Sequence, residues 1–168
     1  MFNKIDKLTQ TEFTEVFGNI FENASWIAKI LYEQKPFKNF NELSKKMIHI
    51  FETTNIKGKL KILNAHPDLA DKAKIGSLTP DSNKEQSSAG LDQCTKEEFN
   101  QFKNLNSEYK NKFGFPFILA VKQKKKSEIL LNFKTRVLSN KKTEFDEGIK
   151  QVIKIANLRL EELKSKFV

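Results

Sequence analysis

The sequence predicts an all-α protein: a single-domain orthogonal multi-helix bundle of about eight helices over residues 1–168. Apolar residues recur at helical spacing, every three or four positions, through most of the chain. Two Thr-x-x-Glu capping boxes, at Thr9 and Thr95, stand directly before such stretches and mark helix starts. The chain has no internal repeat, low-complexity tract or linker, and its 168 residues suffice for one hydrophobic core.

The N-terminal half contains four predicted helices. The first follows the Thr9 capping box and the second ends near Pro36. Asn41 is the expected N-cap of the third, and a short fourth helix precedes His66. The residues expected to face inward here are Phe13, Val16, Phe17, Ile20, Trp26, Ile27, Ile30, Leu31, Leu43, Met47, Ile50, Phe51, Leu60 and Leu63.

A long helix is predicted after Thr95, and Gly114 is its natural C-cap. Asn106 lies in the middle of the apolar stripe of this helix, so we expect it to have a buried hydrogen-bond partner. Residues 115–121 form a continuous apolar run that is too short to assign. It is either a buried extended segment or the start of a core helix.

Two further helices complete the expected fold. Ser127 is the predicted cap of one, and the last helix starts near Thr143 and runs close to the C-terminus. The residues expected to face inward in the C-terminal half are Phe99, Phe102, Tyr109, Phe113, Ile129, Leu130, Phe133, Val137, Ile149, Val152, Ile153, Ala156, Leu160 and Leu163.

Composition narrows the class of protein. Charged residues make up 30% and apolar residues 38% of the chain, which is ordinary for a soluble domain. No apolar run approaches the roughly 18 to 20 residues that span a bilayer, and the N-terminus lacks the apolar stretch of a secretory signal. The single cysteine, Cys94, excludes a disulfide framework. We therefore expect a cytoplasmic protein that does not bind membranes.

The net charge is +9, from 30 Lys and Arg residues against 21 Asp and Glu residues. A basic balance is compatible with nucleic acid, with a membrane surface or with an anionic small substrate. The basic residues are almost all lysines placed singly, and only Lys122–Lys126 forms a block. Because that block lacks clustered arginines and aromatic residues, we do not expect nucleic-acid binding, although it stays an alternative.

The polar stretch 66–91 is the candidate site, because loops on a rigid scaffold often carry function. Proline biases the preceding residue toward extended geometry, so His66 should project from a loop before a helix opened by Pro67 or Asp68. Histidine exchanges its proton near neutral pH and is the commonest general acid or base. The alternative is a helix start at which the histidine is incidental.

Ser82 and Glu85 form a Ser-x-x-Glu capping box, which requires no site. Gln86, however, has no capping role, and Ala89–Gly90 adds a face with almost no side-chain bulk one turn later. Small residues there let a ligand approach the backbone, and free amides at a helix N-terminus favour an anionic or carbonyl oxygen. A plain helix start and a ligand site both remain open.

Other types of site lack sequence signals. His49 and His66 are the only histidines, and no carboxylate cluster accompanies them, so no metal site is predicted. The sequence contains no phosphate-binding glycine loop and no nucleophile elbow. Cys94 is expected to be an inert small side chain. We expect a site with no cofactor.

Three motifs in combination resemble the 2-oxo-4-hydroxy-4-carboxy-5-ureidoimidazoline (OHCU) decarboxylase family. They are His66-Pro67-Asp68-Leu69, Ser82-x-x-Glu85-Gln86-x-x-Ala89-Gly90-Leu91, and Asn106-x-x-Tyr109-x-x-Lys112-Phe113-Gly114-Phe115-Pro116-Phe117-Ile118. The likeness extends to Phe17-Gly18, Glu22, Ser25-Trp26, Arg136, Asn140, Glu144 and Arg159-Leu160. Gly148-Ile149 departs from the Ala-Leu more common in the family, which concerns packing rather than the site.

The resemblance implies a carboxy-lyase that converts OHCU to (S)-allantoin without a cofactor, the last step from urate to allantoin in purine catabolism. It also implies a helical fold and a homodimer. By position, His66 matches the family's catalytic histidine, and Arg159 an arginine near the pocket. The substrate-binding residues that we expect are Pro67, Ser82, Asn83, Lys84, Glu85, Gln86, Phe117, Ile118, Leu119, Ala120, Val121 and Arg159.

The residue types agree with this chemistry. Loss of CO₂ leaves an electron pair that the adjacent imine-type carbon accepts, so the protein must supply orientation, charge placement and a directed proton. We expect His66 to relay the proton, and Glu85, as second catalytic residue, to hold His66 or a ureido N–H. We expect Arg159 to bind a carbonyl oxygen or to position Glu85. Binding the departing carboxylate would stabilise the ground state more than the transition state, because the charge leaves that group. The alternatives are a non-catalytic helical interaction module and a basic nucleic-acid-binding protein.

Overall fold

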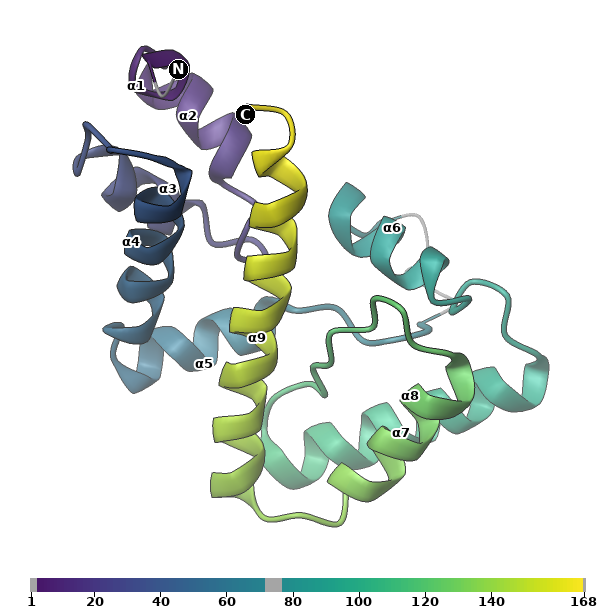
Figure 1. Cartoon of the computed structure of the whole chain (residues 1–168). Helices are drawn as coiled ribbons and strands as arrows, with labels where there is room; N and C mark the ends of the chain where they lie inside the picture. The colour runs from purple at the N-terminus through teal and green to yellow at the C-terminus, as the bar shows by residue number, and fades with distance from the viewer. Residues whose placement is uncertain (1–2, 72–76, 168) are drawn as a thin grey trace. The chain divides into compact units, whose positions relative to one another are not determined.

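The computed structural model describes residues 3–71 and 77–167. Within them the chain forms nine helices and no strand, which confirms the all-α class; the sequence predicted about eight helices (Figure 1). The helices are α1 (Asn3–Asp6), α2 (Gln10–Phe17), α3 (Ser25–Tyr32), α4 (Phe40–Glu52), α5 (Ile56–Ala65), α6 (Pro80–Ser88), α7 (Lys96–Phe113), α8 (Lys126–Arg136) and α9 (Lys141–Lys164). None of these helices is long and apolar enough to cross a membrane.

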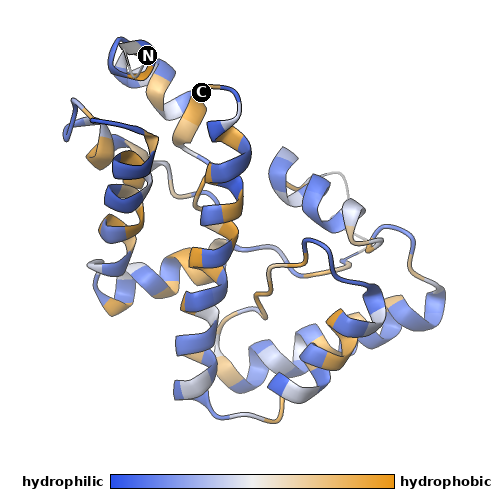
Figure 2. Ribbon diagram, in the orientation of Figure 1, coloured by the Kyte–Doolittle hydropathy of each residue, from blue (hydrophilic) through white to orange (hydrophobic). Residues whose placement is uncertain are grey.

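The chain divides into two compact units. The terminal unit comprises the chain up to Ala65 and the chain from Ile153 onward, and the central unit comprises His66–Val152. Helix α9 begins in the central unit and ends in the terminal unit. In Figure 2 the longer helices carry both apolar and hydrophilic residues, as amphipathic helices do.

The terminal unit packs α2, α3 and α4 around aromatic side chains. The predicted capping box is present, since Thr9 Oγ1 accepts the Glu12 N–H and the Glu12 carboxylate accepts the Thr9 N–H at 2.8 Å. The box directs Phe13 and Phe17 into the core, where their ring centroids lie 4.5 Å apart. Offset ring pairs at this separation add to the stabilisation from apolar burial.

The terminal unit differs from the prediction at one helix cap and at several residues expected to face inward. The N-cap of α4 is Asn39 rather than Asn41: Asn39 has extended backbone and accepts the Glu42 N–H at 2.8 Å, whereas Asn41 already lies in the first turn. Ile30 is 44% exposed, because Ile27 and Leu31 occupy the buried stripe of α3. In α9 the buried residues include Ile155, which was not predicted, whereas Ile153 is half-buried.

The central unit is organised around α7. Its Thr95 capping box is present, and its C-cap Gly114 has a left-handed backbone with φ of 80°. The predicted stripe is buried apart from Phe99, which is half-buried. Residues 115–121 are all buried and form neither helix nor strand, so the alternative of a core helix is excluded.

Two helix starts in the central unit differ from the prediction. The N-cap of α6 is Thr79, whose Oγ1 accepts the Ser82 N–H at 3.3 Å, so Ser82 lies inside the helix. Pro80 is the first helical residue, where a missing N–H leaves no bond unmade. Helix α8 begins one residue before Ser127, at Lys126, whose Nζ is tied to the Gln93 carbonyl and the Glu98 carboxylate.

Candidate functional site

His66 directly follows the last residue of α5 and is half-buried. The sequence predicted a helix opened by Pro67 or Asp68, and this is wrong: residues 66–71 form no helix. The physical reason is that backbone groups of Asp68, Leu69 and Ala70 bond to side chains of α6 and α7. His66 therefore stands at the start of a loop (residues 66–71) that side chains hold in place.

Gln86 on α6 makes the first of these attachments. Its Oε1 accepts the Ala70 N–H at 3.0 Å, and its Nε2 donates to the Asp68 carbonyl at 3.2 Å. Ala70 has a φ of 53°, a left-handed conformation that non-glycine residues seldom adopt, so a fixed partner for its N–H stabilises the turn. Gln86 was expected to have no capping role, and its side-chain amide binds the backbone of the loop instead.

Asn106 and Lys110 on α7 make the other two attachments. The Asn106 side chain is buried and its Nδ2 donates to the Leu69 carbonyl at 2.9 Å, which confirms the expected buried partner. Lys110 Nζ lies 2.6 Å from Asp68 Oδ2 at the protein surface. Four side-chain contacts from two helices thus fix the three residues 68–70.

Helix α6 presents the other predicted cluster. Ser82, Gln86 and Ala89 are buried, Glu85 is half-buried, and Asn83 and Lys84 are exposed. Gly90 follows the helix with a φ of 77° and is partly exposed. Ser82 and Gln86, one turn apart, and the C-cap Ala89 therefore form the buried side of this segment.

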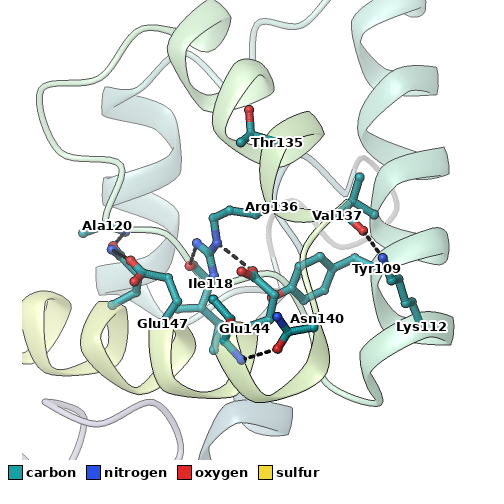
Figure 3. Close-up of polar contacts among 12 residues, drawn as sticks. Tyr109, Lys112, Ile118, Ala120, Thr135, Arg136, Val137, Asn140, Glu144 and Glu147 are labelled. Carbon is teal, nitrogen blue, oxygen red and sulfur yellow. Dashed lines mark hydrogen bonds and ion pairs between the residues drawn. The ribbon is translucent and has the colours of Figure 1, made fainter.

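The segment 117–121 lies in the same unit, and all five of its residues are buried. The Ile118 carbonyl accepts a hydrogen bond from Arg136 Nη1 at 2.7 Å, and the Ala120 N–H donates to Gln151 Oε1 at 3.0 Å (Figure 3). The ring of Phe117 stacks on Phe133 with centroids 3.9 Å apart. The backbone and the first side chain of the segment are thus both fixed.

A buried polar cluster supports this segment. Glu144 Oε1 accepts from Arg136 Nε at 2.8 Å and from the Tyr109 hydroxyl at 2.7 Å. Burial, followed by the bond to Glu144, raises the pKa of Tyr109 well above its ordinary value, so the hydroxyl stays a donor at neutral pH. The sequence alone indicated no role for this cluster. The available signal was a tyrosine on an apolar stripe, whose hydroxyl needs a partner when buried.

Arg159, on α9, belongs to the terminal unit. Its side chain is buried, with Nη2 2.9 Å from Glu22 Oε2 and Nη1 donating to the Asn19 carbonyl at 2.9 Å. The Glu22 carboxylate therefore balances the charge of the guanidinium, and the Asn19 carbonyl accepts one of its N–H groups.

A separate cavity of about 410 Å³ adjoins the loop. It is lined by Asp68, Ala70, Asp71, Phe99, Asn100, Lys103, Asn106 and Ser107. None of the predicted catalytic or substrate-binding residues lines it. Asn106 Oδ1 is buried there without a hydrogen-bond partner among the described residues.

Across residues 3–71 and 77–167, no three His, Cys, Asp or Glu side chains are grouped as metal ligands. Cys94 is half-buried, and its Sγ lies 3.4 Å from the Leu91 carbonyl. Burial, and then the nearby Glu98 charge, raises the pKa of this thiol, which agrees with the expected inert side chain.

The fold and the site together define an all-helical protein in which buried polar side chains hold one loop and one apolar segment. Comparison with known proteins narrows this class. The family profile described as OHCU decarboxylase matches residues 6–161. The chain therefore belongs to the OHCU decarboxylase family.

Individual relatives agree. The chain is 39% identical over 160 residues to a uric acid degradation bifunctional protein of Bacillus sp. (strain TB-90), covering 95% of this chain but 31% of that relative. It is 35% identical over 161 residues to the 2-oxo-4-hydroxy-4-carboxy-5-ureidoimidazoline decarboxylase of Halalkalicoccus jeotgali, covering 96% and 88%. A crystal structure of OHCU decarboxylase in the presence of (S)-allantoin superposes with a TM-score of 0.71 at 25% identity, covering 92% and 97%.

Proposed function

We propose that this chain catalyses the decarboxylation of OHCU to (S)-allantoin, as a carboxy-lyase of urate degradation. The observation that carries the proposal is the family match along almost the whole chain. We further propose that it acts as one domain, in the cytoplasm and as a homodimer, without a cofactor, without binding nucleic acid and without binding membranes.

The proposed chemistry needs a proton delivered to one face of the substrate. The electron pair left by CO₂ is accepted within the substrate, so the protein contributes positioning and proton transfer. We assign the proton relay to His66, which the attachments of residues 68–70 keep on a fixed loop. Glu85, half-buried on α6, is assigned the orientation of His66 or of a ureido N–H.

The segment 117–121 has the properties of a substrate contact. The Ile118 carbonyl accepts a hydrogen bond from Arg136, and the Ala120 N–H donates one to Gln151. Leu119, between them, is buried and makes no backbone hydrogen bond within the part of the chain that is described. A buried peptide N–H and C=O need partners, and a cyclic urea or amide offers the complementary acceptor and donor. We assign these two groups, and the neighbouring apolar side chains, to the substrate.

The remaining residues expected at the site are assigned either to holding the loop or to binding the substrate. Gln86 contributes by holding the loop, because both ends of its side-chain amide are bonded there. Pro67 and Ser82 are assigned to substrate binding, as are the exposed Asn83 and Lys84. We assign Arg159 to binding a carbonyl oxygen of the substrate or to positioning Glu85. Its positive charge is already paired with the Glu22 carboxylate.

The chain offers a matched pair of variants to test this function, because it has two histidines. OHCU would be produced in place from urate by the upstream enzymes, and its decay followed with purified variants. His66→Asn should lose at least about a hundredfold in kcat, as expected on removal of a general acid–base group, while binding of (S)-allantoin is retained. His49→Asn, which changes an exposed residue of α4, should keep the wild-type rate. A His66→Asn variant with near-normal kcat would exclude the role given to His66.

A further inference from the structure

We propose that Arg136 is a positioning residue that sets the conformation of segment 117–121 for the substrate. The inference rests on the proposed function, which makes that segment a substrate contact. Arg136 is the last residue of α8 and its side chain is 11% exposed, so it acts from within the protein and not from its surface.

One guanidinium fixes two consecutive residues of the segment. Arg136 Nη1 donates to the Ile118 carbonyl at 2.7 Å, and the guanidinium carbon lies 4.4 Å from the centre of the Phe117 ring. The first contact fixes a peptide plane and the second fixes a side chain. A planar guanidinium can make both contacts at once, whereas an ammonium is a point charge without a stacking face.

Arg136 is itself held in one orientation. Glu144, whose side chain is 2% exposed, accepts from Arg136 Nε and from the Tyr109 hydroxyl through the same oxygen (Figure 3). The three residues come from α7, α8 and α9, so three helices meet at this point. Through Arg136, the Ile118 carbonyl is therefore held by side chains of three helices of the central unit.

The arrangement is a poor one for stability alone. A buried ion pair stabilises a fold weakly, and apolar residues of similar volume often do so better. Arg136 Nη2 is also buried and has no hydrogen-bond acceptor among the described residues, which adds to the desolvation penalty. A cation kept under these conditions is better explained by the fixed geometry that it gives to Phe117 and Ile118.

The test compares R136M and R136K with two controls on the same helix. K134M removes an exposed cation, and I129V shortens a buried side chain about two turns before Arg136. For each purified protein, KM and kcat are measured with OHCU made in place, and Kd for (S)-allantoin by calorimetry. The melting temperature is recorded in parallel, so that loss of fold is separated from loss of binding.

We expect R136M to raise KM and Kd about tenfold or more, the range for losing a charge-assisted hydrogen bond, with kcat within about threefold. R136K should recover part of this loss. K134M should match the wild type, and I129V should lower the melting temperature while leaving KM unchanged.

The inference is overturned if the R136 variants behave like I129V, with a lower melting temperature but unchanged KM and Kd. If R136M does not fold, the KM, Kd and melting temperature of R136K test the inference in its place. A wild-type protein that does not accelerate OHCU decay would instead overturn the proposed function, so the two failures are distinguishable.

Discussion

Arg159 Nη2 lies 2.9 Å from Glu22 Oε2, and the two side chains are 5% and 2% exposed. This buried pair joins α9 to the turn before α3 within the terminal unit. Arg159 Nη1 also donates to the Asn19 carbonyl, so the guanidinium is fixed at both terminal nitrogens. In any role toward the substrate, Arg159 would therefore act as a cation whose charge is paired with Glu22 and whose side chain is held in one position.

The first prediction concerns this pair. Glu22→Gln should lower the free energy of unfolding by about 3–5 kcal/mol, because it removes a buried negative charge that faces the Arg159 guanidinium. Urea unfolding at pH 7 measures the change. The double variant Glu22→Met, Arg159→Met should recover much of the loss, since it removes both charges. A Glu22→Gln variant within about 1 kcal/mol of the wild type would contradict this account.

The second prediction concerns the loop that carries His66. Gln86→Ala removes the partners of the Ala70 N–H and the Asp68 carbonyl, so it should destabilise the protein by about 1–3 kcal/mol. Misplacement of a catalytic group lowers turnover, and we expect kcat to fall about tenfold or more. Urea unfolding and initial rates of OHCU decay are the measurements.

Ser87→Ala provides the control for Gln86→Ala, because it changes an exposed residue of the same helix and should leave stability and kcat close to the wild type. If Gln86 bound the substrate instead of the loop, its replacement would raise KM and leave kcat and stability largely intact. That pattern would reject the role given to Gln86.

Gly114→Ala isolates a backbone effect. Gly114 has a φ of 80°, and a Cβ at this position would meet no atom within 4 Å, so the substitution adds strain without a clash. We expect a loss of about 1 kcal/mol in the free energy of unfolding. Gly114→Asn should lose less, because asparagine tolerates the left-handed region better. Equal stability of Gly114→Ala and the wild type would show that α7 ends differently.

The capping box of α7 predicts a pH dependence of stability. The Thr95 backbone N–H, as the largest cause, lowers the pKa of Glu98 from its ordinary value of 4.5. A lowered carboxyl pKa in the folded state means that the box stabilises above pH 4.5 and loses this effect as the pH falls below it. Unfolding of Glu98→Gln at pH 7 and pH 3.5 should therefore show a smaller acid destabilisation than the wild type. Glu97→Gln, an exposed first-turn residue outside the box, is the control; a wild-type slope in Glu98→Gln would contradict the prediction.

The sequence predicted local features best where one residue decides the structure. The boxes at Thr9 and Thr95 depend on a side chain and the backbone three residues away, so their signal is complete within four residues. Gly114 is similar, since only the left-handed backbone matters there. The buried partner of Asn106 also followed from its place in an apolar stripe.

Errors arose where neighbouring residues compete for one role. Asn39 and Asn41 are equally good caps in isolation, and the point at which the chain enters α4 selects Asn39. At α6 the Thr79-Pro80 pair was a better start signal than Ser82, because proline favours the first helical position. The loop after His66 could not be predicted, since contacts from Gln86 and Asn106, distant in sequence, replace the helix expected at Pro67.

The most direct test of the function follows the optical rotation of allantoin formed when urate is converted to OHCU in the presence of this protein. The account predicts rapid formation of (S)-allantoin, at a rate proportional to protein concentration. Slow appearance of racemic allantoin, no faster than without the protein, would contradict it.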